Sequence, residues 1–498
     1  MKKNGLLLLF FCGLSFLFYF LIINRPFVCD DYTVLKRVAI DKIIFIKGFF
    51  RPLSDFTLYF NYLIGGFHAW GYYVFNILIH GINSFLLFQF CSKWKWTDNA
   101  HKQQIFAFTA SLLFLTYPFH NECIVWVLGR ASLMASTFGI LGLLILVSSF
   151  SQTIKIVLVC LCWFIGLTAY ESIFLLPLMI FVITYKNRSE IFKRNIIWIV
   201  VLSATLICHL IFRLRISGGF LGSYGQNFFT ERMIHYAANF FKVAGRLFLP
   251  PVQNYYWQAI VFVLLGGLIA GILFFFFRKF RTGNSERIFF YKMIVLLVVT
   301  AVIPVLFSVS TKTSESDRFL YFPSFFLCAL IAFLMVNLLV NKYVFIIIAL
   351  FLLSYNIFFL EKNNENWIKA SDISKDIIST IKSKQYSKKI YIINLPEEKD
   401  GAFIFRSGLE DALMINGVNS DHIKIVNLLK RKEMLNLPEE IEPEKINNEI
   451  RIPPVVDIKT NKADSLTTIQ AGDSSYISND KESVILYWNK KSMITLQR

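Results

Sequence analysis

Apolar runs long enough to cross a lipid bilayer recur along residues 1–360 of this 498-residue chain. They lie near 5–23, 71–90, 105–117, 131–150, 154–170, 172–185, 195–212, 257–277, 288–307, 321–340 and 343–360. A helix needs about 20 apolar residues to span the hydrocarbon core. The hydrophobic fraction of 55% and the mean hydropathy of +0.54 exceed what a soluble chain of this size can bury. We therefore predict an α-helical polytopic membrane protein with about eleven transmembrane helices.

The distribution of Lys and Arg between the loops predicts the orientation of the helices. With a cytoplasmic N-terminus, the even-numbered runs end in the cytoplasm, and three of the loops that follow them are basic. Their cations are Lys93, Lys95 and Lys102, then Lys186, Arg188, Lys193 and Arg194, then Arg278, Lys279, Arg281 and Arg287. The short loops on the opposite side, 117–121 and 169–172, contain no Lys or Arg. This positive-inside bias places the N-terminus in the cytoplasm.

We divide the chain into a transmembrane domain, 1–360, and a small C-terminal domain, 361–498. The transmembrane domain has two long outer loops, 24–70 and 213–256, and the mixed polarity of 231–248 predicts a helix in the membrane interface. An odd number of spans places the C-terminal domain outside the cytoplasm. Strand-like runs at 389–395 and 482–488 and a helix-like run at 407–414 predict an α/β fold there, with 433–482 largely loop.

The net charge of +18 is explained by contact with anionic lipid headgroups. No zinc-ligand spacing or RNA-binding motif accompanies the charge. We therefore predict membrane lipids as partners and no nucleic acid.

An acid pair, Asp30-Asp31, follows the first apolar run in the first outer loop. A carboxylate at the membrane boundary can act as a general base that takes a proton from an acceptor hydroxyl. The same pair could instead cap a helix or belong to a solvated loop. The sequence does not separate the roles of Asp30 and Asp31.

A second polar group follows Pro118 in a short outer loop. His120 comes first, and Glu122, Trp126 and Arg130 then recur every four residues, which predicts one face of a helix. Glu122 and Arg130 on one face could orient an anionic substrate. Alternatively they stabilise the helix, with Arg130 extending to the interface and His120 as an ordinary interfacial residue.

A polar stripe in the second apolar run is formed by Tyr73, Asn76, His80 and Asn83, at spacings of three and four. Polar side chains within a span usually face other helices, because hydrocarbon leaves them unpaired. We expect these residues to form interhelical hydrogen bonds.

Further arginines are expected on the outer side of the membrane. Arg51 lies in the first outer loop, Arg213 and Arg215 follow the seventh run, and Asp317-Arg318 precedes the tenth. Arginine is suited to a phosphate, with which it forms bidentate hydrogen bonds. Alternatively, these arginines contact lipid headgroups.

Taken in order, these segments resemble the C-type (GT-C) membrane glycosyltransferases. The resemblance is to the transmembrane part of the tetratricopeptide-bearing O-mannosyltransferases and their bacterial relatives. The matching residues are Asp30-Asp31, Arg51-Pro52-Leu53, Gly71, Asn76, His80, Pro118-Phe119-His120, Glu122, Trp126, Gly129-Arg130, Glu171, Pro177, and the run from Asp317 to Ser324. The chain departs from the family with Tyr117-Pro118 for His-Pro, with Asp317-Arg318 for Glu-Arg, and in 361–498, which shows no tetratricopeptide period.

The resemblance implies a polyprenyl-phosphate-linked sugar donor and an inverting transfer to a hydroxyl on the extracytoplasmic face. Such a reaction needs a base for the acceptor and cations for the charge that grows on the phosphate. We assign the base to Asp30 or Asp31. The predicted substrate-binding residues are Arg51, Arg130 and Arg318 for the phosphate, with Arg213 and Arg215 behind them, and His120 and Glu122 on the acceptor or sugar side. Asp317 is also predicted to bind substrate.

No cofactor is required by this chemistry, although a divalent metal on the acid pair is compatible with it. The acceptor is left open between a protein, a glycolipid and a cell-envelope polymer, and the expected location is a bacterial inner (plasma) membrane. The alternative is a transporter or flippase of lipid-linked saccharides. Transporters place polar groups near the middle of the membrane, whereas here they gather on one side, and this favours an enzyme.

Overall fold

The computed structural model describes residues 2–185, 191–219, 232–252, 254–279, 284–339, 341–384, 389–446, 449–461, 466–479 and 483–496. The chain forms two compact units. The helical unit contains Met1–Ile23, Ile43–Ile64 and Trp70–Asn364, and the C-terminal unit contains Asn24–Lys42, Gly65–Ala69 and Glu365–Arg498. The segment that carries the acid pair therefore folds with the C-terminal residues, although our sequence division placed it in the transmembrane domain.

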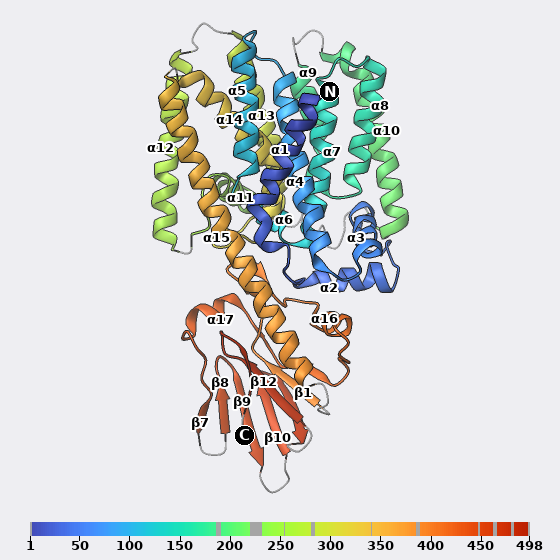
Figure 1. Cartoon of the computed structure of the whole chain (residues 1–498), viewed down its shortest axis with the longest axis vertical. Helices are drawn as coiled ribbons and strands as arrows, with labels where there is room; N and C mark the ends of the chain where they lie inside the picture. Colours follow the sequence, from blue (N-terminus) through green and yellow to red (C-terminus); the bar gives the residue numbers. More distant parts are fainter. Residues whose placement is uncertain are drawn as a thin grey trace. The chain divides into compact units, whose positions relative to one another are not determined.

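The helical unit is built from helices that run side by side, one for each predicted apolar run (Figure 1). They are α1 (Lys2–Tyr19), α4 (Ala69–Lys93), α5 (Ala100–Leu115), α7 (Arg130–Leu146), α8 (Gln152–Leu167), α9 (Leu176–Thr184), α10 (Ile191–Ser217), α12 (Tyr255–Lys279), α13 (Asn284–Phe307), α14 (Tyr321–Leu338) and the first part of α15 (Lys342–Ser383). Within the described ranges, seven helices are long and apolar enough to cross a membrane, and three further apolar helices are shorter. A mostly helical chain with several candidate membrane spans is thus confirmed, while the count of eleven spans stays a prediction.

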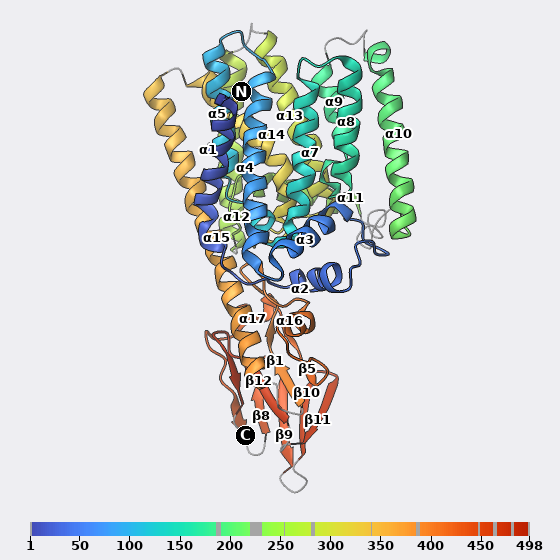
Figure 2. The same cartoon turned by 45° about the vertical axis from the view of Figure 1, so that its right-hand side comes forward.

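Burial separates central helices from peripheral ones. The apolar window of α14 is 78% buried and that of α7 is 72% buried, against 6% for α15. Helix α14 lies among α5, α7 and α13, which it contacts (Figure 2). The most enclosed helices are therefore α14 and α7. Five of the predicted site residues lie shortly before these helices or at their start: His120, Glu122, Arg130, Asp317 and Arg318.

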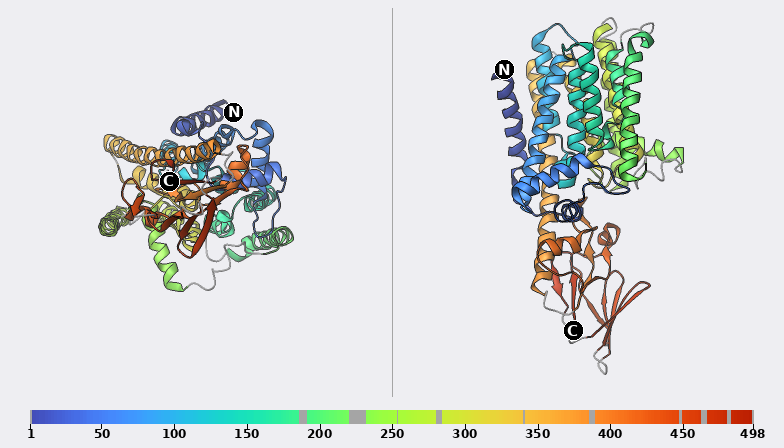
Figure 3. Two further views of the ribbon diagram at one scale, coloured as in Figure 1. Left: turned by 90° about the horizontal axis from the view of Figure 1, so that it is seen from below. Right: turned by 90° about the vertical axis from the view of Figure 1, so that its right-hand side faces the viewer.

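Short elements gather at the end of the bundle opposite the N-terminus of α1 (Figures 1 and 3). They are α3 (Pro52–Gly65), α6 (Asn121–Ile124), α11 (Met233–Arg246) and the single turns η3 (Val127–Gly129), η4 (Glu171–Ile173) and η6 (Asp317–Leu320). The helix expected over 231–248 corresponds to α11, and residue 231 lies outside the described residues. The seventh apolar run continues as α10 to Ser217, so Arg213 and Arg215 lie in the last turns of a helix and not after it.

The continuous helix expected through Glu122, Trp126 and Arg130 is wrong. The turn α6 ends at Ile124, Trp126 is extended with ψ 123°, and α7 begins at Arg130. The chain folds back on itself here, and Gly129 lies against the backbone of Glu122: a Cβ at Gly129 would be 2.1 Å from the Glu122 carbonyl oxygen, so only glycine fits. Because the helix is broken, Glu122, Trp126 and Arg130 do not share a helix face.

The C-terminal unit contains a mixed sheet in the order β13-β12-β1-β5. Its strands are β1 (Lys389–Ile393), β5 (Ile423–Ile425), β12 (Ser483–Trp488) and β13 (Met493–Thr495), with β1 parallel to both β12 and β5. Four of the five residues of β1 are buried, as expected for a central parallel strand. The helices of this unit are α2 (Asp30–Leu35), the π-helical turn η2 (Lys36–Ile40), α16 (Leu409–Ile415), α17 (Arg431–Asn436) and the end of α15.

A second sheet occupies most of the stretch that we expected to be largely loop. Strands β7 (Glu444–Ile446), β8 (Glu449–Ile452), β9 (Val456–Asn461), β10 (Leu466–Ala471) and β11 (Ser474–Asn479) form an antiparallel meander, drawn in dark orange and red in Figures 2 and 3. The buried side chains alternate along β9 and β10, as at Val456, Ile458, Thr467 and Ile469. Two short pairs complete the unit: β2 (Leu395–Pro396) with β6 (Leu428–Leu429), and β3 (Glu398–Lys399) with β4 (Ala402–Phe403).

Candidate active site

The helical unit places Glu122 of α6 against Arg318 of η6. The Arg318 backbone N–H donates to Glu122 Oε2 at 2.8 Å, and its guanidinium Nη1 donates to Glu122 Oε1. Glu122 is fully buried, whereas 22% of the Arg318 side chain is exposed. Burial raises the pKa of the Glu122 carboxyl, and the charge and hydrogen bonds of Arg318 oppose this shift. Glu122 therefore holds Arg318 from the buried side and leaves the guanidinium partly accessible.

Tyr170 joins Arg318 to a second cation, Arg51. Arg318 Nε donates to the Tyr170 hydroxyl at 3.4 Å, and the Arg51 guanidinium lies 4.5 Å from the centre of the Tyr170 ring. Burial raises the pKa of the Tyr170 hydroxyl, and the charges of Arg318 and Arg51 oppose this shift. Among the residues that the structure describes, no carboxylate lies within ion-pair distance of Arg51. Its charge is therefore available to an anion.

Arg213 reaches the residue that follows Tyr170. Its Nη2 atom lies 2.9 Å from Glu171 Oε1, and its guanidinium stacks over Phe50 at 5.6 Å. Arg215, two residues further along α10, is exposed. The fold thus brings together three of the predicted cations, Arg51, Arg213 and Arg318, around Tyr170 and Glu171; we call these five residues the arginine cluster.

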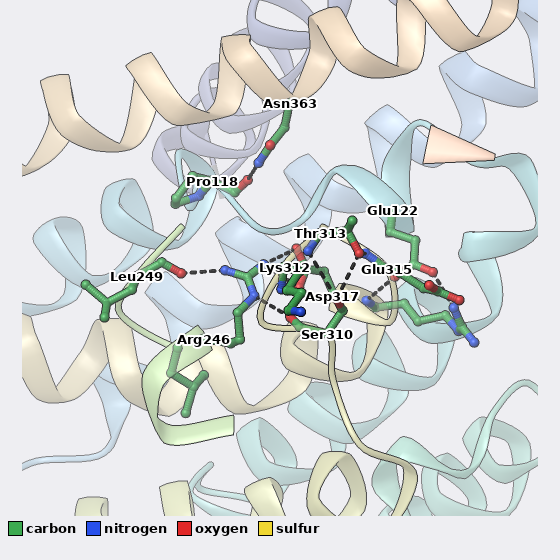
Figure 4. Close-up of polar contacts among 12 residues, drawn as sticks. Pro118, Glu122, Arg246, Leu249, Ser310, Lys312, Thr313, Glu315, Asp317 and Asn363 are labelled. Carbon is green, nitrogen blue, oxygen red and sulfur yellow. Dashed lines mark hydrogen bonds and ion pairs between the residues drawn. The ribbon is translucent and has the colours of Figure 1, made fainter. Parts of the chain in front are cut away.

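Asp317 is engaged by a residue that the sequence analysis did not select, Arg246 of α11. The two side chains are 1% and 2% exposed, and Arg246 Nη2 lies 2.6 and 2.5 Å from the two carboxylate oxygens. Arg246 also donates to the carbonyl oxygens of Ser310, at 3.0 Å, and Leu249 (Figure 4). The pair therefore anchors the residue immediately before Arg318 to α11.

Arg130 is buried, and the contacts that define its position are with residues of α3 and α4. It donates to Asn61 Oδ1 at 2.6 Å and to the Tyr72 carbonyl at 3.2 Å, and it stacks over Phe75 at 4.7 Å. These contacts join α7 to α3 and α4. The structure thus gives Arg130 a role in helix packing.

The polar stripe of α4 forms interhelical hydrogen bonds, as the sequence predicts. The Asn76 amide nitrogen lies 3.2 Å from the carbonyl oxygen of Ile124, the last residue of α6. It also lies 3.4 Å from the carbonyl oxygens of Trp126 and Val127, which accept from the backbone N–H groups of Gly129 and Arg130 as well. His80 and Asn83 both contact the Tyr321 hydroxyl, at 2.8 and 3.0 Å. The stripe therefore holds the first turn of α14 and the segment after Glu122.

His120 belongs to the same buried network. Its Nε2 atom lies 2.7 Å from Ser324 Oγ, and the Ser324 hydroxyl donates to the Tyr321 carbonyl at 2.7 Å. Since a hydroxyl has one hydrogen, His120 Nε2 must be the protonated nitrogen that donates to Ser324. Burial, and after it the neighbouring His80, lowers the pKa of His120 well below its usual range. His120 is therefore a neutral residue within the protein body.

The acid pair lies in the C-terminal unit, where it opens α2. Asp31 is fully buried, and its Oδ2 accepts from the Val28 N–H at 3.3 Å. Asp30 is only part-buried, and its Oδ1 accepts from the Ser407 hydroxyl and, at 3.1 Å, from the Cys29 thiol. The structure thus distinguishes an enclosed Asp31 from an accessible Asp30.

The sequence analysis did not select three residues that contact the predicted site residues: Arg246, Tyr170 and Ser407. Each contacts a residue far along the chain, so no local pattern points to it. Tyr170 alone had a signal, because it adjoins Glu171, which matches the family. Within the described residues, no group of three or more His, Cys, Asp or Glu side chains is arranged to hold a metal ion.

Comparison with known proteins confirms the predicted resemblance to membrane-bound glycosyltransferases, specifically the protein O-mannosyl-transferases. The chain is 36% identical over 115 residues to protein O-mannosyl-transferase TMTC4 of Mus musculus, covering 21% of this chain and 15% of that protein. It is 35% identical over 95 residues to protein O-mannosyl-transferase TMTC2 of Homo sapiens, covering 19% and 11%. A third relative, protein O-mannosyl-transferase F38B6.6 of Caenorhabditis elegans, is 29% identical over 109 residues, or 22% and 15%.

These matches therefore span about a seventh or less of the relatives' own length. No protein-family model matches the chain, and no solved structure matches it.

Proposed function

We propose that this protein is a membrane glycosyltransferase that moves a sugar from a polyprenyl-phosphate-linked donor to an acceptor hydroxyl, with inversion, on the extracytoplasmic side of a plasma membrane. The observation that carries the proposal is the pair of guanidinium groups, Arg51 and Arg318, on one tyrosine, Tyr170. Two cations at one point favour a dianionic or growing anionic group such as phosphate. The relatives' names add mannose as the sugar to test first and a protein as the acceptor.

The chemistry requires three events. The acceptor oxygen attacks the anomeric carbon of the sugar, the bond from that carbon to the phosphate oxygen breaks with its electron pair going to the phosphate, and the acceptor proton passes to a base. The leaving phosphate is already a weak base, so stabilising its charge matters more than protonating it. In the proposal, Arg51 and Arg318 supply this stabilisation. Arg213 adds to the positive electrostatic potential at the phosphate, and Glu122 orients Arg318.

Asp30 is the proposed base. A base must be reachable by the acceptor hydroxyl, and Asp30 is part-buried whereas Asp31 is fully buried. Asp31 accepts a hydrogen bond from the backbone N–H of Val28, so we propose that it fixes the start of α2. No step in this scheme needs a metal ion.

The test uses the full chain in detergent with a polyprenyl-phosphate-linked mannose as donor and a Ser/Thr-containing polypeptide as acceptor. Asp30→Asn is expected to lower kcat by at least about 100-fold, the usual contribution of a general base. Arg51→Gln is expected to lower kcat/KM about 100-fold, because the phosphate charge in the transition state loses a cation. Arg278→Gln, which changes an exposed arginine of α12, serves as the matched control and should leave both constants unchanged.

Wild-type activity in Asp30→Asn would reject the base assignment, and wild-type kcat/KM in Arg51→Gln would reject the phosphate site. Wild-type protein that moves the lipid-linked sugar between leaflets of a vesicle without consuming it would instead favour a flippase.

A further inference from the structure

We propose that Ser407 of the C-terminal region is a positioning residue for Asp30, so that this region is part of the catalytic machinery. The inference rests on the proposed function of Asp30. Ser407 lies 377 residues further along the chain, in the turn before α16, and its hydroxyl donates to Asp30 Oδ1. A hydrogen bond from a hydroxyl to one oxygen of a carboxylate restricts the rotation of that carboxylate and so orients it.

The bond forms within an extensive contact between residues 28–36 and residues 404–411. The Cys29 N–H donates to the Ile404 carbonyl at 2.9 Å, and the rings of Tyr32 and Phe405 stack at 6.4 Å. Lys36 Nζ lies 3.6 Å from Asp411 Oδ1. The two segments are therefore joined by backbone, aromatic and ionic contacts on both sides of the Ser407–Asp30 bond.

Gly408 shows how closely the two segments approach. Its φ is +81°, and a Cβ at this position would lie 2.5 Å from the Cys29 carbonyl oxygen and 3.1 Å from Thr33 Oγ1. Both the backbone conformation and the space require glycine. The turn is thus built to bring Ser407 against the start of α2.

Cys29 completes the surroundings of Asp30. Its thiol donates to Asp30 Oδ1 at 3.1 Å and lies 3.8 Å from Ser407 Oγ. Burial raises the pKa of the Cys29 thiol to about 12, so it remains a neutral donor. Both donors converge on Oδ1, which leaves Asp30 Oδ2 as the oxygen that takes the acceptor proton in this proposal.

The test compares Ser407→Ala and Ser407→Thr in the mannose-transfer assay. Loss of a hydrogen bond to a charged group predicts a fall in kcat of about tenfold or more for Ser407→Ala, with an unchanged KM for the lipid-linked donor. Ser407→Thr retains the hydroxyl and should restore kcat to within about twofold of wild type. In an Asp30→Asn background, Ser407→Ala should cause no further loss, because its partner carboxylate is already gone.

The matched control is Lys36→Ala, which removes an ionic contact between the same two segments without touching Asp30. It should keep the wild-type kcat. Equal losses in Ser407→Ala and Lys36→Ala, or equal losses in the Ala and Thr variants, would overturn the inference, since segment docking alone would then explain them. A wild-type kcat in Ser407→Ala with an inactive Asp30→Asn would overturn the inference and leave the proposed function intact. An active Asp30→Asn would overturn the proposed function itself.

Discussion

Asp317→Asn is predicted to destabilise the helical unit strongly, because it removes the charge that compensates a buried guanidinium. Asp317 and Arg246 are 1% and 2% exposed, so neither side chain can exchange its partner for water. Asparagine has nearly the same shape as aspartate but presents an NH₂ group where a carboxylate oxygen stood. A donor would then face the Arg246 guanidinium, itself only a donor.

The magnitude follows from the contacts. Arg246 makes two hydrogen bonds to Asp317, at 2.6 and 2.5 Å, and two to backbone carbonyls that the substitution leaves in place. Removing one partner of a buried ion pair lowers the free energy of unfolding by about 3–5 kcal/mol. We expect the lower end, about 3 kcal/mol, because the amide oxygen of the introduced asparagine and the two backbone carbonyls still accept from Arg246. That loss changes the ratio of folded to unfolded protein by about 100-fold.

The assay is thermal unfolding of the full chain in a mild detergent, followed by the amount of monodisperse protein after heating. Arg215→Gln, at an exposed position of α10, is the control and should unfold at the wild-type temperature. In a double-mutant cycle with Arg246→Met, the two losses should fall short of additivity by roughly 2 kcal/mol. A wild-type melting temperature for Asp317→Asn, or strict additivity with Arg246→Met, would refute the reasoning.

Three further predictions concern the buried residues around the arginine cluster. Since burial holds the pKa of His120 well below its usual range, the unfolded chain takes up a proton there that the folded chain does not; the contribution of His120 to stability should be constant above about pH 6.5 and fall below it. His120→Asn should weaken this dependence of the melting temperature on pH, and an equally steep curve would show that another group titrates. Asn76→Leu should lower stability by about 1–3 kcal/mol, because the carbonyl oxygen of buried Ile124 loses its side-chain donor; an unchanged melting temperature would contradict this. Tyr170→Phe should raise the donor KM about tenfold without changing stability, since Arg318 loses a hydroxyl partner, and an unchanged KM would count against the cluster as a phosphate site.

Local pattern was sufficient for most elements. Every predicted apolar run coincides with a helix, and the strand-like runs at 389–395 and 482–488 correspond to β1 and β12. The stripe of Asn76, His80 and Asn83 correctly identified the inward face of α4, because helical periodicity is a property of neighbouring residues.

The same reasoning failed where a distant residue changed the local outcome. The four-residue spacing of Glu122, Trp126 and Arg130 favoured one helix, but α6 ends at Ile124, whose carbonyl oxygen accepts from Asn76 of α4, and the chain at Gly129 approaches the Glu122 backbone closely. The antiparallel meander of β7–β11 was likewise missed, because its strands are short and polar and are stabilised by pairing with one another.

The sequence by itself determined the helical membrane class, the order of the segments that resemble protein O-mannosyl-transferases, and which side chains carry charge. Only the tertiary structure decided how those charges are paired: Asp317 with Arg246, Glu122 with Arg318, and Asp30 with Ser407. The physical reason is one of range. Helix formation depends on residues three or four positions apart, whereas an ion pair or hydrogen bond here joins residues up to 377 positions apart, and its strength is set by the burial that the whole fold provides.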